Sequence, residues 1–245
     1  MKHLLILLLL FCSISFSKVK YILEIDSCLH EKAFEIAIGE IGVTEATGKN
    51  DGPRVEEYLR VVGLSKGYPY CAAGISWCYY KAASFYNKPK SFIPFPMTAG
   101  SQTVYNYAIK NGEKSSDNVK SKDFFIWRKK DSYQGHIGII ENVGEKGWVY
   151  TIEFNTSNNS TGDQRDGGGV WRKKRNLIHP LGRLRVRGFV GFKKIKSNLC
   201  KSEIITITKS NIVDTYNLKK LAKKEEYSIL EYAYINILKL KNLYV

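Results

Sequence analysis

Apolar residues recur three and four positions apart in the first half of the chain and in short, often alternating runs in the second half. The first pattern predicts amphipathic helices and the second predicts β-strands. The predicted helices are 29–42, 53–62, 71–82 and 101–111, and the predicted strands are 123–127, 135–143, 148–155, 170–174 and 188–194. Because helices come first and strands follow, we expect an α+β fold whose N-terminal helices pack on an antiparallel sheet of about five to six strands.

The N-terminus has the pattern of an export signal. A short basic start precedes an unbroken apolar run from Leu4 to Phe11, and small residues follow as far as Ser17. The run is too short for a permanent transmembrane helix. We therefore expect residues 1–17 to be a removable signal peptide, and the protein to be periplasmic or extracellular without a stable membrane span. Lipid anchoring at Cys12 is an alternative that the bulky Phe11 disfavours.

The net charge narrows the choice of partner. The chain carries 38 Lys and Arg against 23 Asp and Glu, which gives a formal charge of +15. Such a charge suits nucleic acid, anionic lipid or the acidic bacterial cell wall. Export argues against nucleic acid, and the sequence contains no evident nucleic-acid recognition motif. We therefore expect the wall polymer as partner, the alternative being that scattered lysines only keep the protein soluble.

The five cysteines are Cys12, Cys28, Cys71, Cys78 and Cys200. Their spacing lacks the paired pattern of a zinc site, and the acidic residues lack the alternating spacing of a calcium loop. We therefore expect neither a metal nor a cofactor. In an oxidising compartment a disulfide between Cys28 and Cys200, or between Cys28 and Cys78, is conceivable, but the sequence specifies neither a disulfide nor its pairing.

Cys71 is the first candidate for catalytic chemistry. It follows Pro69 and precedes an alanine-rich apolar stretch, which predicts a buried helix with Cys71 in its first turn. A helix N-terminus stabilises a thiolate, and the thiolate is the form that attacks carbonyl carbon. The alternative is an inert buried cysteine.

His136 is the second candidate. It lies near the start of the strand predicted over 135–143, in which the odd-numbered residues 137 and 139 are apolar. His136 and Gly138 therefore share the opposite face. A neutral imidazole close to the thiol can take its proton and later return a proton to a leaving amine. The alternative is a solvent-exposed strand histidine.

The predicted hairpin supplies partners for His136. A tight turn over residues 144–147 would place His136 opposite Asn155 and Gly138 opposite Glu153. Directly opposed Cβ atoms lie about 5 Å apart and the diagonal glutamate lies about 7 Å away, within reach of its side chain. Either acceptor would fix the tautomer of the imidazole, as the third member of a catalytic triad does. A slip of one residue would turn both acceptors away.

Several short segments form an ordered set of motifs. They are 48–52 (GKNDG), 67–77 (GYPYCAAGISW), 123–126 (DFFI), 135–140 (GHIGII) and 151–156 (TIEFNT). In this order they resemble the motifs of the CHAP family, the cysteine, histidine-dependent amidohydrolases/peptidases. The resemblance extends from about residue 35 to residue 193 and covers most of the chain after the signal.

The resemblance implies a papain-like, NlpC-type fold and a set of roles. Cys71 would be the nucleophile, His136 the general base and Glu153 the residue that orients His136, with Asn155 supporting the site. The implied substrate-binding residues are Tyr70, Trp77 and Asn50. One departure is Phe154, where many relatives carry glycine.

The resemblance also implies an activity. Family members cleave amide bonds of peptidoglycan through a thioester, so we expect an N-acetylmuramoyl-L-alanine amidase or an endopeptidase. A non-catalytic wall-binding protein that keeps the fold is the alternative. We expect a monomer with a catalytic domain over 28–196. The basic tail, 197–245, either is a helical extension or loosely resembles a degenerate LysM wall-binding module.

Overall fold

The computed structural model describes residues 19–158, 167–196 and 199. Its helices are α1 (Ser27–Gly39), α2 (Pro53–Arg60), α3 (Cys71–Phe85) and α4 (Ser101–Asn111), with a short 3₁₀ helix at Lys90–Phe92. Its strands are β1 (Lys20–Asp26), β2 (Glu113–Ser115), β3 (Phe124–Lys129), β4 (Gly135–Val143), β5 (Trp148–Thr156), β6 (Gly169–Asn176) and β7 (Leu184–Ile195). Backbone contacts divide the chain into two units after residue 196, and these elements all belong to the first.

The expected α+β fold is confirmed, with more strands than the sequence indicated. Among the described residues the strands form one seven-stranded sheet in the order β2-β1-β7-β3-β4-β5-β6. The sheet is antiparallel except where β1 runs parallel to β7. Neither β1 nor β2 was predicted from the pattern of apolar residues. The signal peptide, the tail module and any role of Cys12 or Cys200 concern residues outside the described ranges.

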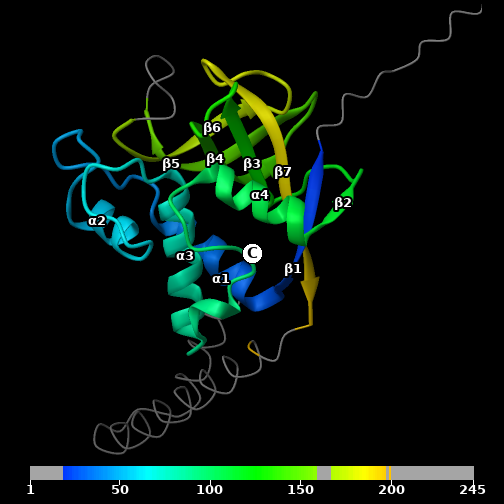
Figure 1. Cartoon of the computed structure of the whole chain (residues 1–245), viewed down its shortest axis with the longest axis horizontal. Coiled ribbons are helices and arrows are strands. Elements are labelled where there is room, and N and C mark those ends of the chain that lie inside the picture. The colour runs from blue at the N-terminus through cyan, green and yellow to red at the C-terminus, as the bar shows by residue number, and fades with distance from the viewer. Residues whose placement is uncertain (1–18, 159–166, 197–198, 200–245) are drawn as a thin grey trace, which may run out of the picture. The chain divides into compact units, whose positions relative to one another are not determined.

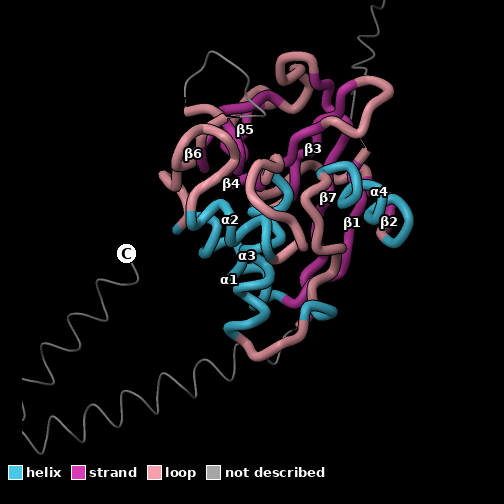
Figure 2. The backbone as a smooth tube through the Cα atoms, turned by 60° about the vertical axis from the view of Figure 1, so that its left-hand side comes forward, coloured by secondary structure: helices cyan, strands magenta, loops and turns pink. Residues whose placement is uncertain are grey.

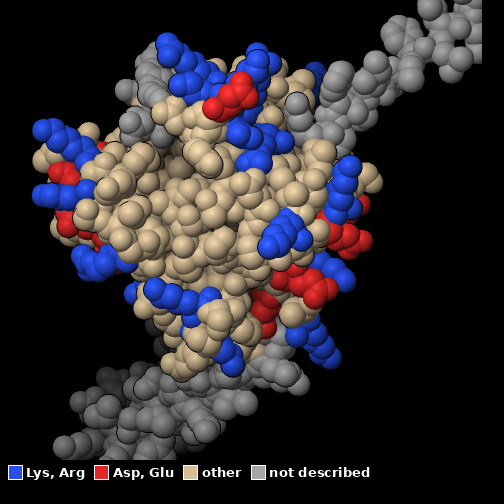
Figure 3. All heavy atoms as spheres, viewed as in Figure 1, with Lys and Arg blue, Asp and Glu red and all other residues tan. Residues whose placement is uncertain are grey.

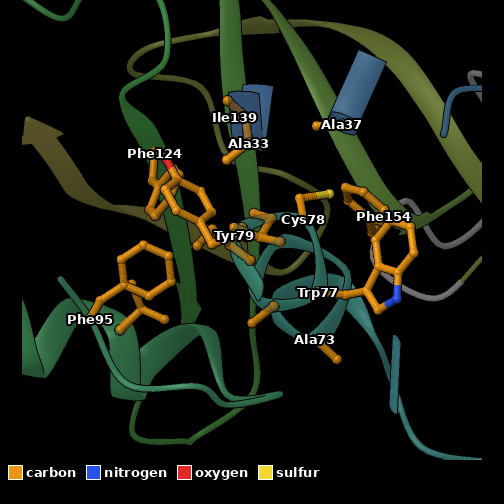
Figure 4. Close-up of a cluster of buried hydrophobic side chains, with 14 of the residues drawn as sticks. Ala33, Ala37, Ala73, Trp77, Cys78, Tyr79, Phe95, Phe124, Ile139 and Phe154 are labelled. Atoms are coloured by element: carbon orange, nitrogen blue, oxygen red, sulfur yellow. The ribbon is translucent and has the colours of Figure 1, made fainter. Parts of the chain in front are cut away.

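The helices α1, α2 and α3 lie together on one side of the molecule, and α4 lies beside the strands β1, β3 and β7 (Figures 1 and 2). Helix α3 contacts α1, α2, β4 and β5, so it is the centre of the packing. Small residues make this position possible, because Ala72, Ala73 and Gly74 are fully or almost fully buried. Figure 4 shows Trp77 and Cys78 of α3 close to Phe154 of β5.

A second apolar cluster lies apart from the helical core. Its members are Phe125, Trp127, Ile140, Val149, Leu181, Leu184, Val186 and Phe189. In β3 they alternate with Phe124 and Ile126, which belong to the core that contains α3. Alternate residues of a strand point to opposite faces, so the central strands are covered on both sides. Polar side chains on these strands are therefore removed from water.

The cysteines differ in state. Cys28 is disulfide-bonded, whereas Cys71 and Cys78 are free thiols. The Cys28–Cys78 alternative is therefore wrong, and the other alternative involves Cys200, which is not among the described residues. Across 19–158 and 167–196, no helix combines the length and apolar character that a bilayer crossing requires.

Candidate active site

Cys71 is the first residue of α3, as the sequence predicted. The helix begins without a side-chain cap, because the N-cap residue Tyr70 makes no capping hydrogen bond. The first N–H groups of a helix have no acceptor within the helix, and together with the helix dipole they attract negative charge. Cys71, which lies at these N–H groups, is only 5% exposed. The thiol therefore lies at a shielded, electropositive helix end.

The β4–β5 hairpin has the predicted register where the candidate site lies. Gly138 pairs with Glu153, and the pairing continues through Ile140 and Thr151. Nearer the turn the register shifts by one residue, since Asn142 pairs with Tyr150. The turn is thus one residue longer than predicted, and a bulge at Glu141 restores the alignment. The predicted pairing of His136 with Asn155 is absent from the β4–β5 ladder, which starts at Gly138.

His136 and Glu153 are in direct contact. Nε2 of His136 lies 3.0 Å from Oε2 of Glu153, and both side chains are fully buried. Because a carboxylate only accepts, Nε2 carries the hydrogen, and Nδ1 is the basic nitrogen of the neutral ring. Nδ1 has no hydrogen-bond partner among the described residues. It is available to exchange a proton with the thiol of Cys71, which lies close enough to raise the pKa of the ring.

Both carboxylate oxygens of Glu153 accept hydrogen bonds. Oε1 accepts from the Thr151 hydroxyl at 2.6 Å and from Nε of Arg175 at 2.8 Å. Oε2 accepts from Nη2 of Arg175 at 2.6 Å, in addition to its contact with His136. Gly138 provides the space, because a Cβ there would lie 2.8 Å from Cγ of Glu153. The carboxylate therefore has one orientation, and that orientation is the one that contacts the imidazole.

The pKa values follow from these contacts. Burial alone would lower the pKa of His136, but the neighbouring Cys71 and Glu153 raise it to about 9. Burial alone would raise the pKa of Glu153, but Arg175 and then His136 hold it well below its usual range. Glu153 is therefore an anion at every pH at which the protein would work. An imidazolium at residue 136 is stabilised up to mildly alkaline pH.

Asn155 adopts an unusual backbone conformation beside the site. Its φ is +55°, and it lies where the register of β5 and β6 shifts between Glu153 and Thr156. Asparagine adopts left-handed backbone more readily than most residues. Its side chain is fully buried. The supporting role assigned to Asn155 remains a prediction, and the bulge explains why the residue leaves the simple alternation of the strand.

The three predicted substrate-binding residues take part in packing and loop contacts. Tyr70 is fully buried and donates to Oε1 of Glu45, while the backbone N–H of Asn50 donates to Oε2 of that glutamate. Trp77 is 4% exposed and lies against Tyr58. These contacts join the loop before α2 to the segment before Cys71. The assignment to substrate binding stays a prediction, since neither ring presents an exposed face.

Arg175 and Thr151 were missed by the sequence analysis. Arg175 belongs to a basic run, 172–175, and such runs are typical of solvated strand edges. Its side chain is in fact turned inward and only 12% exposed. The alternation of β6 puts Arg175 on the face of Glu153. This could not be predicted, because it depends on the register between β5 and β6, and the sequence between the two strands does not specify that register.

Comparison with known proteins agrees with this geometry. The family model of the CHAP domain matches residues 63–155. No curated protein matches the chain, and no solved structure matches it either. The matched segment contains Cys71, His136, Glu153 and Asn155 and stops before β6. Residues 63–155 of this chain are a CHAP domain.

Proposed function

We propose that the chain is an exported cysteine amidohydrolase that cleaves amide bonds of bacterial peptidoglycan. The observation that carries the proposal is the thiol of Cys71 at the start of α3, next to an imidazole that the Glu153 carboxylate orients. Nucleophile, base and orienting acceptor in this order are what acyl transfer through a thioester requires. The CHAP domain supports the same class of reaction.

The reaction would proceed in two halves. His136 holds the proton that the Cys71 thiol gives up, and the sulfur attacks the carbonyl carbon of the amide. The N–H groups at the uncapped start of α3 are placed to stabilise the resulting oxyanion. His136 then passes the proton to the amine as the C–N bond breaks, which leaves a thioester on Cys71. A water molecule, deprotonated by His136, releases the carboxylic acid and restores the thiol.

Peptidoglycan as substrate rests on the family and on the net charge of +15. On the face drawn in Figure 3, lysine and arginine side chains are spread around the margin and the middle is uncharged. A spread of this kind suits general attraction to an anionic polymer better than one specific anion pocket. We also propose that residues 1–17 are removed on export and that the mature protein acts as a monomer outside the cytoplasm.

Digestion of purified peptidoglycan fragments tests the proposal. The wild-type chain should release new ends, which mass spectrometry assigns either to the muramoyl–alanine amide or to a peptide bond. Cys71→Ala should release none, and Cys78→Ala, which removes the other free thiol of α3, should digest as the wild type does. Intact fragments after treatment with folded wild-type protein would contradict catalysis and would favour a wall-binding role.

A further inference from the structure

Arg175 makes the strongest contact of Glu153. Two nitrogens of the guanidinium group bind two oxygens of the carboxylate, at 2.8 Å and 2.6 Å. This paired geometry fixes both the position and the plane of the carboxylate. The side chain of Glu153 has no exposed surface, so the pair is shielded from water and from salt.

The two cations that face Oε2 of Glu153 compete for its charge. Nη2 of Arg175 and Nε2 of His136 both lie within 3.0 Å of this oxygen. The other titratable groups that face the cluster are Cys71 of α3 and Lys173 of β6. The ammonium group of Lys173 donates to the carbonyl oxygen of Ser157 instead. Arg175 is therefore the permanent charge that offsets Glu153 directly.

We propose that Arg175 is a positioning residue that acts through Glu153 and limits how tightly His136 holds its proton. The proposal rests on the proposed function, in which His136 must both accept and release a proton. Arg175 belongs to β6, which lies beyond the segment that the family model matches.

The direction of the effect follows from the charges. Without Arg175, the buried carboxylate keeps a full negative charge, and its remaining hydrogen-bond partners are the imidazolium and the Thr151 hydroxyl. The proton on His136 is then harder to remove. A charge at this range shifts a pKa by about one unit or more, so the titration midpoint of His136 should move upward by about that amount.

The experiment follows the ring of His136 by NMR in the full chain with labelled histidines. A Cys71→Ala background removes the coupled thiol and makes the readout independent of hydrolysis. Arg175→Gln should raise the midpoint of His136 by about one pH unit. The matched control is Arg172→Gln, because Arg172 lies on the same strand but pairs with Glu141 at an exposed position, with a side chain 53% exposed. This control should leave the midpoint unchanged.

Two further variants test whether the effect of Arg175 passes through Glu153 and cover the case in which Arg175→Gln does not fold. In a Glu153→Gln background, Arg175→Gln should have no additional effect, because the proposed action passes through that carboxylate. If Arg175→Gln alone does not fold, Arg175→Lys replaces it and should give a smaller upward shift, since an ammonium group binds the carboxylate less completely. An unchanged midpoint in the folded variant, or an equal shift with and without Glu153, would overturn the proposal. A failed peptidoglycan digestion would leave this titration result standing.

Discussion

Two thiols on one helix differ in their surroundings. Cys71 begins α3 beside a histidine, whereas Cys78 is fully buried in the apolar core. Burial raises the pKa of the Cys78 thiol well above its usual value. Cys78 therefore remains protonated and shielded, so the difference in reactivity arises from position alone.

Alkylation should distinguish the two thiols. Iodoacetamide added to the native protein at neutral pH should modify Cys71 and leave Cys78 intact, as peptide mapping would show. The modified protein should lose hydrolytic activity by about 10³-fold or more, as we also expect for Cys71→Ala. The Cys78→Ala variant should react at the rate of the wild type. Modification of Cys78 in the folded protein, with Cys71 untouched, would contradict the assignment of the nucleophile.

Because His30 is buried, we expect the folded protein to lose stability in acid. It is 3% exposed, its ring lies against Phe192 and Tyr79, and neither ring nitrogen has a hydrogen-bond partner among the described residues. Burial lowers its pKa to about 4. The unfolded chain, with a pKa near the ordinary value, takes up the proton first as the pH falls. His30 should therefore lower the free energy of unfolding by about 1 kcal/mol per pH unit between about pH 6 and 5, where it is mostly charged in the unfolded chain and neutral in the folded one.

The substitution His30→Phe should remove that slope, because phenylalanine suits the aromatic surroundings and does not titrate. Urea unfolding at several pH values measures it. The control is His179→Gln, since His179 is exposed and should not affect the slope. Between about pH 6 and 5 the raised pKa of His136 adds little, because that residue is then mostly protonated in both the folded and the unfolded chain. The lowered pKa of Glu153 affects stability mainly below this window. A slope that persists without His30 would show that another group causes it.

At the scale of elements, the hairpin shows why part of the site could be predicted. Its strands are close in sequence, so alternation and a short turn specify which side chains share a face. The turn itself was predicted one residue too short, and the bulge at Glu141 compensates. Cys71 was predictable for a similar reason, because a proline and small residues mark the start of a helix. Local patterns therefore sufficed to find Cys71, His136 and Glu153, the three residues to which we assign the proposed chemistry.

The remaining elements depend on distant partners. Strand β2 has three residues, of which two are exposed, so it has no apolar pattern to detect. Strand β1 pairs with β7, which lies more than 160 residues further along the chain. Arg175 reaches Glu153 only because β6 takes one particular register beside β5. None of these pairings is encoded in a local run of residues.

The absence of a side chain at Gly74 allows α3 to pack closely against β5. A Cβ at this position would lie 2.1 Å from the ring of Phe154, and such a contact requires a displacement. Gly74→Ala should lower the free energy of unfolding by about 1–3 kcal/mol, as overpacking of a core does, and should reduce activity by moving Cys71. Gly39→Ala in α1 is the control, because nothing lies within 4 Å of its Cβ position. Thermal unfolding compares them, and equal stability of the two variants would contradict the packing argument.

At the scale of the whole molecule, β1 connects the N-terminus to the rest of the sheet. It contributes the buried residues Leu23 and Ile25, and Lys20 forms a buried ion pair with Asp123 at 3.2 Å. It also lies between β2 and β7 in the sheet. The catalytic domain, expected from residue 28 onward, therefore has a sheet that begins at Lys20.

Truncation tests the role of β1. A chain that starts at Lys18 should unfold cooperatively at the same temperature as the full chain, because all described strands remain. A chain that starts at Ser27 should lose cooperative unfolding, since it lacks the strand that holds β2 and half of a buried ion pair. Circular dichroism during heating measures both. Equal melting of the two truncated chains would show that β1 is dispensable.

The pairing of β1 with β7 also has a consequence for the proposed function, because it determines when the sheet can be completed. In a chain exported as we propose, β1 would cross the membrane long before β7, its neighbour in the sheet. The sheet cannot close until residues 184–195 have followed. The proposed hydrolase would then become active only after it has crossed the membrane, without any separate inhibitor.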